Sequence, residues 1–238
     1  MPKINDVKII AIGDIHGRDI WKDIVGSQTF DKVIFMGDYF DSKTNIHPLA
    51  EQNNFRDIVA FKKANSDRVV LLFGNHDYHY LRTVYETYSN FQELQKVYIE
   101  QLLDDAISAH LIQMCFLHDK FLFSHAGITK TWLHSHGFSP GTNSIESYVN
   151  YLFKFKPKSF AFQPGTNASG KGNDITQSPI WVRLPSLLAD GVDFTQVVGH
   201  TQQDTITQVD DKVILIDALE NGEYLVIDAG KIIVQSVQ

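Results

Sequence analysis

Five short apolar runs in the chain, each rich in Val, Ile, Leu or Phe, end directly at a polar motif that contains Asp, Asn or His. Such runs, bounded by glycine and polar residues, predict β-strands. Each predicted strand therefore presents a carboxylate, an amide or an imidazole at its carboxyl end. In order along the chain, the motifs are GDIHGR (13–18), GDYFDS (37–42), GNHD (74–77), SHAG (124–127) and GHT (199–201).

Segments of helical character separate the early strands, which predicts an α/β fold in which helices cover a sheet. Three further apolar runs, at 212–217, 224–228 and 231–237, follow one another with only short turns between them. This spacing predicts antiparallel pairing among the three runs and therefore a mixed sheet. The helical segments are 18–25, 49–64 and 91–110.

Residues 129–180 interrupt this alternation, because they are rich in Gly, Ser, Asn and Pro and contain one short helical stretch, near 145–155. Long irregular segments within compact domains often form lids or binding loops. We expect residues 1–238 to form a single domain, with 129–180 as an insertion or cap over the active site. A solvated connection without a function is the alternative interpretation of this segment.

The charge balance excludes a generally basic surface, since 28 acidic residues face 21 basic ones, for a net charge of -7. Such a chain is not expected to bind nucleic acid in general or an anionic membrane. None of its apolar runs approaches the length of a transmembrane helix. The single cysteine, Cys115, fits a reducing compartment, so we expect a cytoplasmic protein.

The polar motifs favour a metal centre, because Asp, Asn and His bind divalent first-row ions, whereas one cysteine cannot build a thiolate site. The carboxyl ends of the strands in an open α/β sheet converge on a common ligand site. Two ions about 3.5–4 Å apart can clamp a phosphoryl group and generate hydroxide between them. The candidate ligands are Asp14 and His16 for one ion, Asp38 as a bridge, and Asn75, His125 and His200 for the other ion.

Taken together, the motifs GDIHGR, GDYFDS, GNHD, SHAG and VGHT resemble the ordered motifs of the calcineurin-like metallophosphoesterases, from about residue 9 to residue 201. The resemblance implies an αββα sandwich of two mixed β-sheets flanked by helices, with two divalent metal ions at the strand ends. It implies the same distribution of the six candidate ligands between the two ions. Manganese is the expected metal, with iron, zinc, nickel or cobalt as alternatives.

The resemblance also implies a catalytic pair, in which His76 is the general acid and Asp41 is the carboxylate that orients it. The alkoxide that leaves a phosphate ester needs a proton, and an imidazolium held by a carboxylate can supply it near neutral pH. Asp41 is therefore expected to raise the pKa of His76. In the alternative interpretation, His76 only packs within its loop.

Two departures from the family patterns indicate which branch this chain resembles. The motif GHTQ (199–202) lacks the second His of a Gly-His-x-His pattern, which is similar to the Ser/Thr protein phosphatases and the symmetrical diadenosine tetraphosphatases. That branch usually has a phosphate-binding Arg where Ser42 stands, and serine offers no guanidinium fork. Arg183 is the preferred replacement and Arg18 is the second candidate. Lys171 is expected to be solvated.

These features predict a metal-dependent phosphoesterase that hydrolyses a phosphomonoester, on a phosphoprotein or a small phosphate, by direct attack of a metal-bridging hydroxide. A dinucleoside polyphosphate hydrolase with the same dinuclear site is the alternative, and a non-catalytic scaffold of this fold is a more remote one. The expected partner is thus a phosphorylated protein, nucleotide or small molecule. A nucleotide substrate would require aromatic stacking groups, for which residues 129–180 offer Trp132, Tyr148, Phe153 and Phe160.

Overall fold

Strands and helices alternate through the first half of the chain, as the apolar pattern predicts. The computed structural model describes residues 7–84, 86–163, 165 and 172–237. The strands are β1 Lys8–Ile12, β2 Lys32–Phe35, β3 Val69–Leu72, β4 Ile112–Gln113, β5 Cys115–His118, β6 Phe121–Ser124, β7 Thr195–Val198, β8 Thr207–Gln208, β9 Val213–Leu215, β10 Glu223–Asp228 and β11 Lys231–Ser236. The helices are α1 Trp21–Ser27, α2 Pro48–Ala64, α3 Asn75–Tyr78, α4 Lys96–Ser108, α5 Lys130–Ser135, α6 Ile145–Phe155 and α7 Leu184–Asp190, with 3₁₀ turns η2 Glu93–Gln95, η3 Pro157–Phe160 and η4 Leu219–Asn221.

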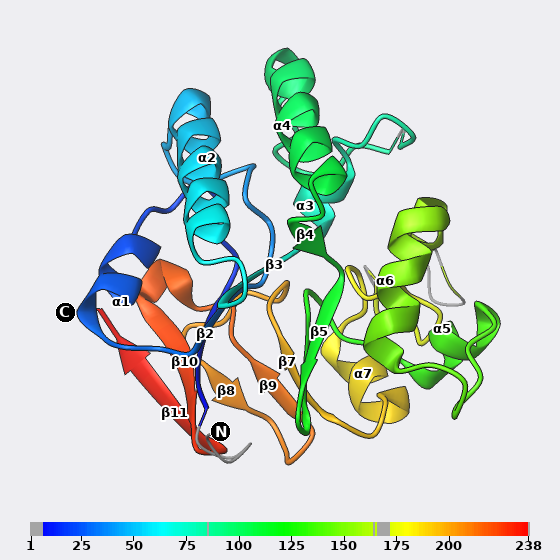
Figure 1. Cartoon of the computed structure of the whole chain (residues 1–238). Coiled ribbons are helices and arrows are strands. Elements are labelled where there is room, and N and C mark those ends of the chain that lie inside the picture. Colours follow the sequence, from blue (N-terminus) through cyan, green and yellow to red (C-terminus); the bar gives the residue numbers. More distant parts are fainter. Residues whose placement is uncertain (1–6, 85, 164, 166–171, 238) are drawn as a thin grey trace.

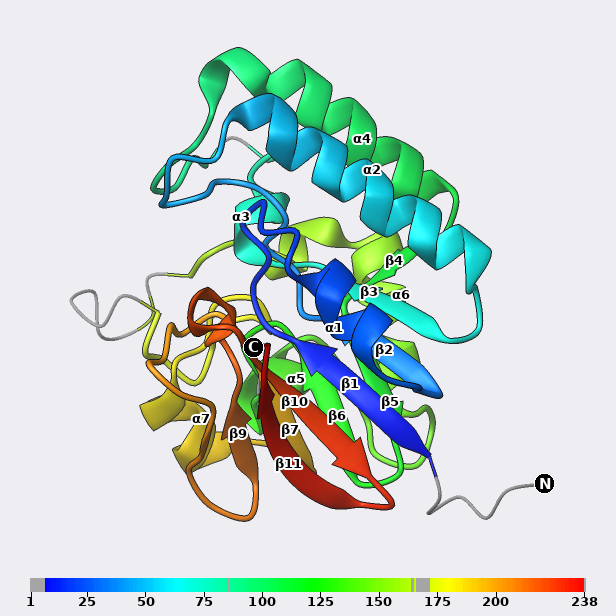
Figure 2. The same ribbon diagram turned by 90° about the vertical axis from the view of Figure 1, so that its left-hand side faces the viewer.

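Two mixed β-sheets pack face to face, with helices on their outer sides (Figures 1 and 2). One sheet has the order β11-β10-β1-β2-β3-β4, and the other has the order β5-β6-β7-β9-β8. Helices α2 and α4 lie side by side over the six-stranded sheet, as Figure 2 shows. The expected αββα sandwich is therefore confirmed.

The alternation of side chains along the strands builds this layering. In β1, Ile10 and Ile12 join the apolar cluster that includes residues of α1 and α2, whereas Ile9 and Ala11 join the cluster between the sheets. On the outer face of the five-stranded sheet, Leu187 of α7 packs in a third cluster. Alternate residues of β1 are thus buried by a helix layer on one side and by the opposing sheet on the other.

Parallel pairing brings the polar motifs to a common edge. Strands β1, β2 and β3 are parallel neighbours in one sheet, and β6, β7 and β9 are parallel neighbours in the other. Parallel strands present their carboxyl ends at the same edge, so the loops that follow them lie close together. The motifs that open at 13, 37, 74, 124 and 199 all follow strands of these two sets.

The antiparallel pairing predicted among the last three strands is correct for only one of the two pairs. Strands β10 and β11 pair antiparallel, but β9 belongs to the five-stranded sheet and β10 to the six-stranded sheet, where β10 pairs with β1. The short connection through η4 therefore crosses between sheets. Stacked sheets lie only about 10 Å apart, so a few residues suffice either to turn back within one sheet or to cross to the other sheet. Loop length alone therefore does not distinguish the two connections.

The prediction for residues 129–180 also needs a correction, since more than one helical segment is present. Helix α6 occupies 145–155 as expected, but α5 precedes it and η3 follows it. Thr129 starts α5 as a typical N-cap, because its Oγ1 accepts a hydrogen bond from the Trp132 N–H.

Lys171 lies outside the described residues. Among the described helices, none has the length and apolar character that crossing a bilayer requires.

Candidate active site

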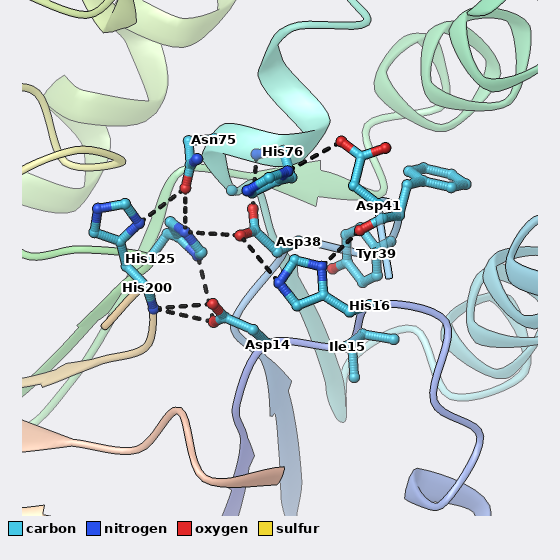
Figure 3. A network of polar contacts seen from close by, with 12 residues as sticks. Asp14, Ile15, His16, Asp38, Tyr39, Asp41, Asn75, His76, His125 and His200 are labelled. Carbon is cyan, nitrogen blue, oxygen red and sulfur yellow. Dashed lines mark hydrogen bonds and ion pairs between the residues drawn. The ribbon is translucent and has the colours of Figure 1, made fainter. Parts of the chain in front are cut away.

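The six candidate metal ligands come together at the edge where the parallel strands of both sheets end (Figure 3). Asp14 and His16 follow β1, Asp38 follows β2, Asn75 opens α3 after β3, and His125 and His200 follow β6 and β7. A pocket of about 270 Å³ opens over them. Besides five of the six candidate ligands, its walls include His76, Lys43, Tyr88, Ser89, Trp181 and Arg183.

The ligand atoms point toward one another within a buried cluster. Atoms of Asp14, Asp38 and His125 lie within 4.8 Å of one another, and all three side chains are buried. The Asn75 Oδ1 lies 2.9 Å from the His125 Nε2 and 2.9 Å from the His200 Nδ1. On the other side, the His16 Nε2 lies 3.7 Å from the Asp38 Oδ2. The side chains from five different loops therefore converge around Asp38.

The hydrogen bonds behind the histidines show that this cluster fits cations. The Nδ1 of His16 lies 2.7 Å from the Phe40 carbonyl oxygen, and the Nδ1 of His125 lies 2.9 Å from the Met36 carbonyl oxygen. A carbonyl only accepts, so each Nδ1 carries the proton and each neutral ring turns an Nε2 lone pair toward the cluster. These lone pairs face carboxylate and amide oxygens, an arrangement of acceptors that a cation satisfies.

Burial and charge keep these histidines ready to bind metal. Burial lowers the pKa of His16 to about 4, and it also lowers the pKa of His125 and His200 below the usual value. The pKa of Asp38 is lowered as well, because the surrounding histidines outweigh the effect of its burial, with His125 contributing most. Neutral imidazoles around an ionised carboxylate are the protonation states that a divalent ion requires.

The loops that carry these ligands adopt a backbone conformation that is unusual for residues other than glycine. A positive φ costs a non-glycine residue on the order of 1–3 kcal/mol, and such strain persists where the surrounding structure enforces it. It clusters at binding and catalytic sites. The affected residues here are His16 (φ 41°), Asp38 (φ 51°), Asp41 (φ 62°) and His200 (φ 62°).

Asp77, which belongs to the GNHD motif, enforces this conformation at Asp38. Its carboxylate accepts hydrogen bonds from the backbone N–H groups of Gly74 (2.9 Å), Asp38 (2.9 Å) and Tyr39 (2.8 Å). The same loops approach so closely that a Cβ on Gly74 would lie 2.1 Å from the Asp38 Oδ1. Glycine is therefore required at position 74, and Asp77 ties together the loops that follow β2 and β3.

His76 and Asp41 form a hydrogen-bonded pair beside the cluster. The His76 Nδ1 lies 3.0 Å from the Asp41 Oδ2, and His76 lines the pocket. Burial opposes the charged imidazolium, but the Asp38 carboxylate and then the hydrogen bond to Asp41 raise the pKa of His76 above its usual value. The expected influence of Asp41 on the pKa of His76 is thus present, with Asp38 as the larger contributor.

A second buried group of ionisable side chains surrounds Asp41. His79 has its Nε2 2.6 Å from the Asp41 Oδ2, and the Tyr80 hydroxyl donates to the Asp41 Oδ1 over 2.5 Å. Asp41, His76 and His79 make up this group. Although burial would raise it, the pKa of Asp41 is lowered by hydrogen bonds, first from His76 and then from His79. Asp41 is therefore an ionised carboxylate held from several sides.

The two arginine candidates lie in different places. Arg183 lines the pocket over the cluster, where its Nη1 donates to the His200 carbonyl oxygen (3.3 Å) and the Thr201 hydroxyl oxygen (3.0 Å). Arg18 lines a separate pocket beside α1 and α2, and its Nη2 lies 3.4 Å from the Glu220 carboxylate. Only Arg183 thus joins the candidate ligands in one pocket.

Several residues of the site were missed in the sequence. Asp217 follows β9 and influences the pKa of Asp14, so the rule that picks out polar residues at strand ends would have found it. His79 lies three residues after His76 and directly follows α3, and this spacing of about one helical turn brings the two rings to the same side. The pocket residues Lys43, Tyr88 and Trp181 lie in irregular segments, and no periodicity indicates them.

The raised pKa values of Asp14 and Asp217 predict that protons are released when metal binds. Burial and then the Asp217 charge raise the pKa of Asp14, while burial and then Asp38 raise the pKa of Asp217 to about 6. With its pKa at about 6, the Asp217 carboxyl is largely ionised by pH 8 but still holds protons at pH 6, so metal binding to chelator-treated protein releases more protons at pH 6 than at pH 8. Calorimetry in buffers of different ionisation enthalpy measures this release.

The Asp217→Asn variant serves to test the assignment of these protons. Removing the neighbouring negative charge lowers the pKa of Asp14, so fewer protons remain to be released at pH 6. A release at pH 6 that is the same in Asp217→Asn as in the native protein would contradict the prediction. The exposed Asp57, which pairs with Lys22 on the surface, provides the matched control Asp57→Asn, for which no change is expected.

Comparison with known proteins identifies the class to which this fold and site belong. Residues 7–215 match the calcineurin-like phosphoesterase family, and the chain belongs to that family. Together with the buried His and Asp groups, the match identifies the protein as a metallophosphoesterase. No protein of curated function matches the sequence.

Solved structures share the fold at low sequence identity. A cold-active protein-tyrosine phosphatase from a psychrophilic Shewanella species has a TM-score of 0.63 and 18% identity, over 98% of this chain and 81% of that chain. A protein serine/threonine phosphatase from Saccharomyces cerevisiae has a TM-score of 0.59 and 14% identity, over 98% of this chain and 80% of that chain. A metallophosphoesterase from Sphaerobacter thermophilus has a TM-score of 0.50 and 13% identity, over 97% and 88%.

Proposed function

We propose that this metallophosphoesterase hydrolyses phosphomonoesters at the pocket over the Asp38 cluster. The single observation that carries the proposal is the convergence of acid, amide and imidazole atoms around Asp38, next to a hydrogen-bonded histidine–aspartate pair. A binding scaffold without activity would not need this pair. Residues 1–238 act in this proposal as one catalytic domain, with 129–180 as an insertion beside the site.

In the proposed centre, Asp14 and His16 would hold one divalent ion, Asn75, His125 and His200 would hold the other, and Asp38 would be the ligand shared between them. Such ions lower the pKa of water and neutralise charge on the phosphoryl oxygens. Manganese is the proposed metal, with iron, zinc, nickel or cobalt as alternatives that metal-loading assays distinguish. The buried Cys115 agrees with the reducing, cytoplasmic setting that we propose.

The chain's own residues supply the remaining chemistry. His76 is the proposed general acid, which protonates the leaving oxygen, and Asp41 holds its Nδ1 so that the Nε2 faces the substrate. Arg183 binds the phosphoryl oxygens through a charge-assisted hydrogen bond in place of the arginine missing at Ser42. The exposed Lys43, on another wall of the same pocket, adds a positive charge near the entrance.

The substrate that fits best is a single phosphate ester on a side chain or small molecule. A pocket of about 270 Å³ is smaller than those that commonly enclose drug-sized ligands, roughly 300–1,000 Å³. None of the four aromatic residues of 129–180 that were considered for nucleotide stacking lines this pocket, whose aromatic wall residues are Tyr88 and Trp181. Two structural neighbours are protein phosphatases, which supports a phosphoprotein over the dinucleoside polyphosphate alternative.

Turnover of a phosphopeptide and of diadenosine tetraphosphate by the manganese-loaded protein tests the substrate class. We expect the phosphopeptide to have the higher kcat/KM. Arg183→Ala should lower kcat/KM about 10- to 100-fold, since hydrogen bonds to charged groups contribute about 1.5–3 kcal/mol. Arg18→Ala, in the separate pocket, is the matched control and should stay within about threefold of the native value. Higher kcat/KM on diadenosine tetraphosphate would overturn the proposed substrate.

A further inference from the structure

His79 occupies a buried position between the histidine–aspartate pair and the wall of the substrate pocket. Its side chain is fully buried, and its Nε2 lies 2.6 Å from the Asp41 Oδ2, the same oxygen that His76 contacts at 3.0 Å. The ring packs edge-on against Tyr80 (4.4 Å between centroids) and Phe91 (4.8 Å). A polar ring enclosed in this way is held in one orientation.

The surroundings of the two ring nitrogens define the tautomer of His79. The Tyr88 backbone N–H donates to the His79 Nδ1 over 3.3 Å, so this nitrogen carries a lone pair and no proton. The proton of the neutral ring is therefore on Nε2, the atom that faces the Asp41 carboxylate. His79 thus accepts a hydrogen bond from the Tyr88 N–H with one nitrogen and lies in close polar contact with the Asp41 carboxylate through the other.

Tyr88 connects this ring to the substrate pocket. Its side chain stacks on His79, with 5.4 Å between ring centroids and 12° between the ring planes, and it lines the pocket over the metal cluster. Tyr88 also packs edge-on against Trp181, another wall residue, at 4.4 Å between centroids. One buried ring therefore contacts both the carboxylate behind the proposed acid and the loop that shapes the pocket wall.

We infer that His79 is a positioning residue with two separable functions. Through Nε2 it fixes the orientation of Asp41, and hence of the His76 ring, while through Nδ1 it fixes the Tyr88 backbone at the pocket wall. The inference rests on the proposed role of His76 and Asp41 as the acid pair. It assigns His79 no contact with the substrate.

Two amide substitutions separate the two functions. The amide nitrogen of Gln reaches about as far as the histidine Nε2, so His79→Gln keeps a donor toward Asp41 and loses the acceptor for Tyr88. The amide oxygen of Asn lies near the place of Nδ1, so His79→Asn keeps the acceptor and loses the donor toward Asp41. The assay compares an alkyl phosphate, which has a poor leaving group, with p-nitrophenyl phosphate, which has an activated one.

For His79→Asn, we expect kcat on the alkyl phosphate to fall about 10-fold, with KM near the native value. This loss is at the lower end of the range for substitutions of residues that orient a directly acting group. On p-nitrophenyl phosphate its kcat should change less than about threefold, because an activated leaving group needs little proton assistance. For His79→Gln, we expect near-native kcat on both substrates and a KM raised about threefold. Metal content and thermal unfolding are measured for both variants.

The inference is overturned if His79→Asn and His79→Gln lose kcat to the same extent. It is also overturned if one of these variants loses kcat to the same extent on both substrates, since each of these results indicates only damage to the fold. His76→Ala and Asp41→Asn run in the same assay keep this outcome apart from a failure of the proposed function. If those variants show no dependence on the leaving group, the acid pair itself is refuted. If they show it and both His79 variants behave like the native protein, only the role of His79 is refuted.

Discussion

Asp38→Asn is expected to lower kcat on p-nitrophenyl phosphate by on the order of 10³-fold in the presence of manganese, because metal ions contribute several kcal/mol of transition-state stabilisation. Asp38 is the centre of the cluster, with His16 at 3.7 Å on one side and His125 at 3.5 Å on the other. The amide has a similar size but lacks the negative charge that two cations require between them. The variant should also retain less metal after dialysis.

Thermal unfolding of the metal-free protein tests whether the substitution damages the fold. The Asp38 Oδ1 also accepts a hydrogen bond from the His76 backbone N–H at 2.9 Å. An asparagine oxygen can accept the same bond, so thermal unfolding of the metal-free variant should remain close to that of the metal-free native protein. Asp57→Asn on the surface is the control for the change of charge. More than a tenth of the native kcat in Asp38→Asn would refute the bridging role.

His76→Ala should lower kcat on an alkyl phosphate by about 10²- to 10⁴-fold, the range typical of general acid catalysis. The loss on p-nitrophenyl phosphate should be much smaller, because that leaving group departs without a proton. The Nδ1 hydrogen bond to Asp41 and the raised pKa of His76 support this expectation. Initial rates on both substrates, each saturating, measure the difference.

Asp41→Asn should show the same dependence on the leaving group with a smaller loss, since the imidazole remains but its charged form is less favoured. His134→Ala, at an exposed histidine far along the chain in α5, is the control for removing an imidazole. An equal loss of kcat on both substrates in His76→Ala would rule out the acid and indicate that His76 only packs within its loop.

How far the sequence predicted the site depends on whether a residue belongs to a strand-end motif. The ligands of the Asp38 cluster stand directly after apolar runs, and parallel pairing brings such positions to one edge whatever the details of packing. Asp217 obeys the same rule, but it is the last residue of the predicted strand at 212–217 and no glycine precedes it, so no motif marks it. His79, Tyr88 and Trp181 reach the site through helix and loop geometry, which leaves no periodic pattern.

The separation of β9 and β10 into different sheets and the choice between Arg183 and Arg18 illustrate what a local sequence pattern cannot decide. The sequence around each arginine does not show which one reaches the site. The packing of α7 against the five-stranded sheet brings Arg183 to the pocket. Likewise, a short turn permits β10 to join either sheet, and its partner β1 is more than 200 residues away in the chain. Long-range packing determines both outcomes.

By itself, the sequence determined the α/β class and the set of acid, amide and imidazole groups around Asp38, because apolar periodicity and strand-end motifs are local properties of the chain. The resemblance of those motifs to a known family implied the αββα layers. Only the tertiary structure decided which groups hold Asp41, which arginine lines the pocket and how wide that pocket is. The physical reason is that the orientation of a buried polar side chain depends on the hydrogen-bond partners that distant segments bring to it. His79, held between Asp41 and Tyr88, is the clearest example.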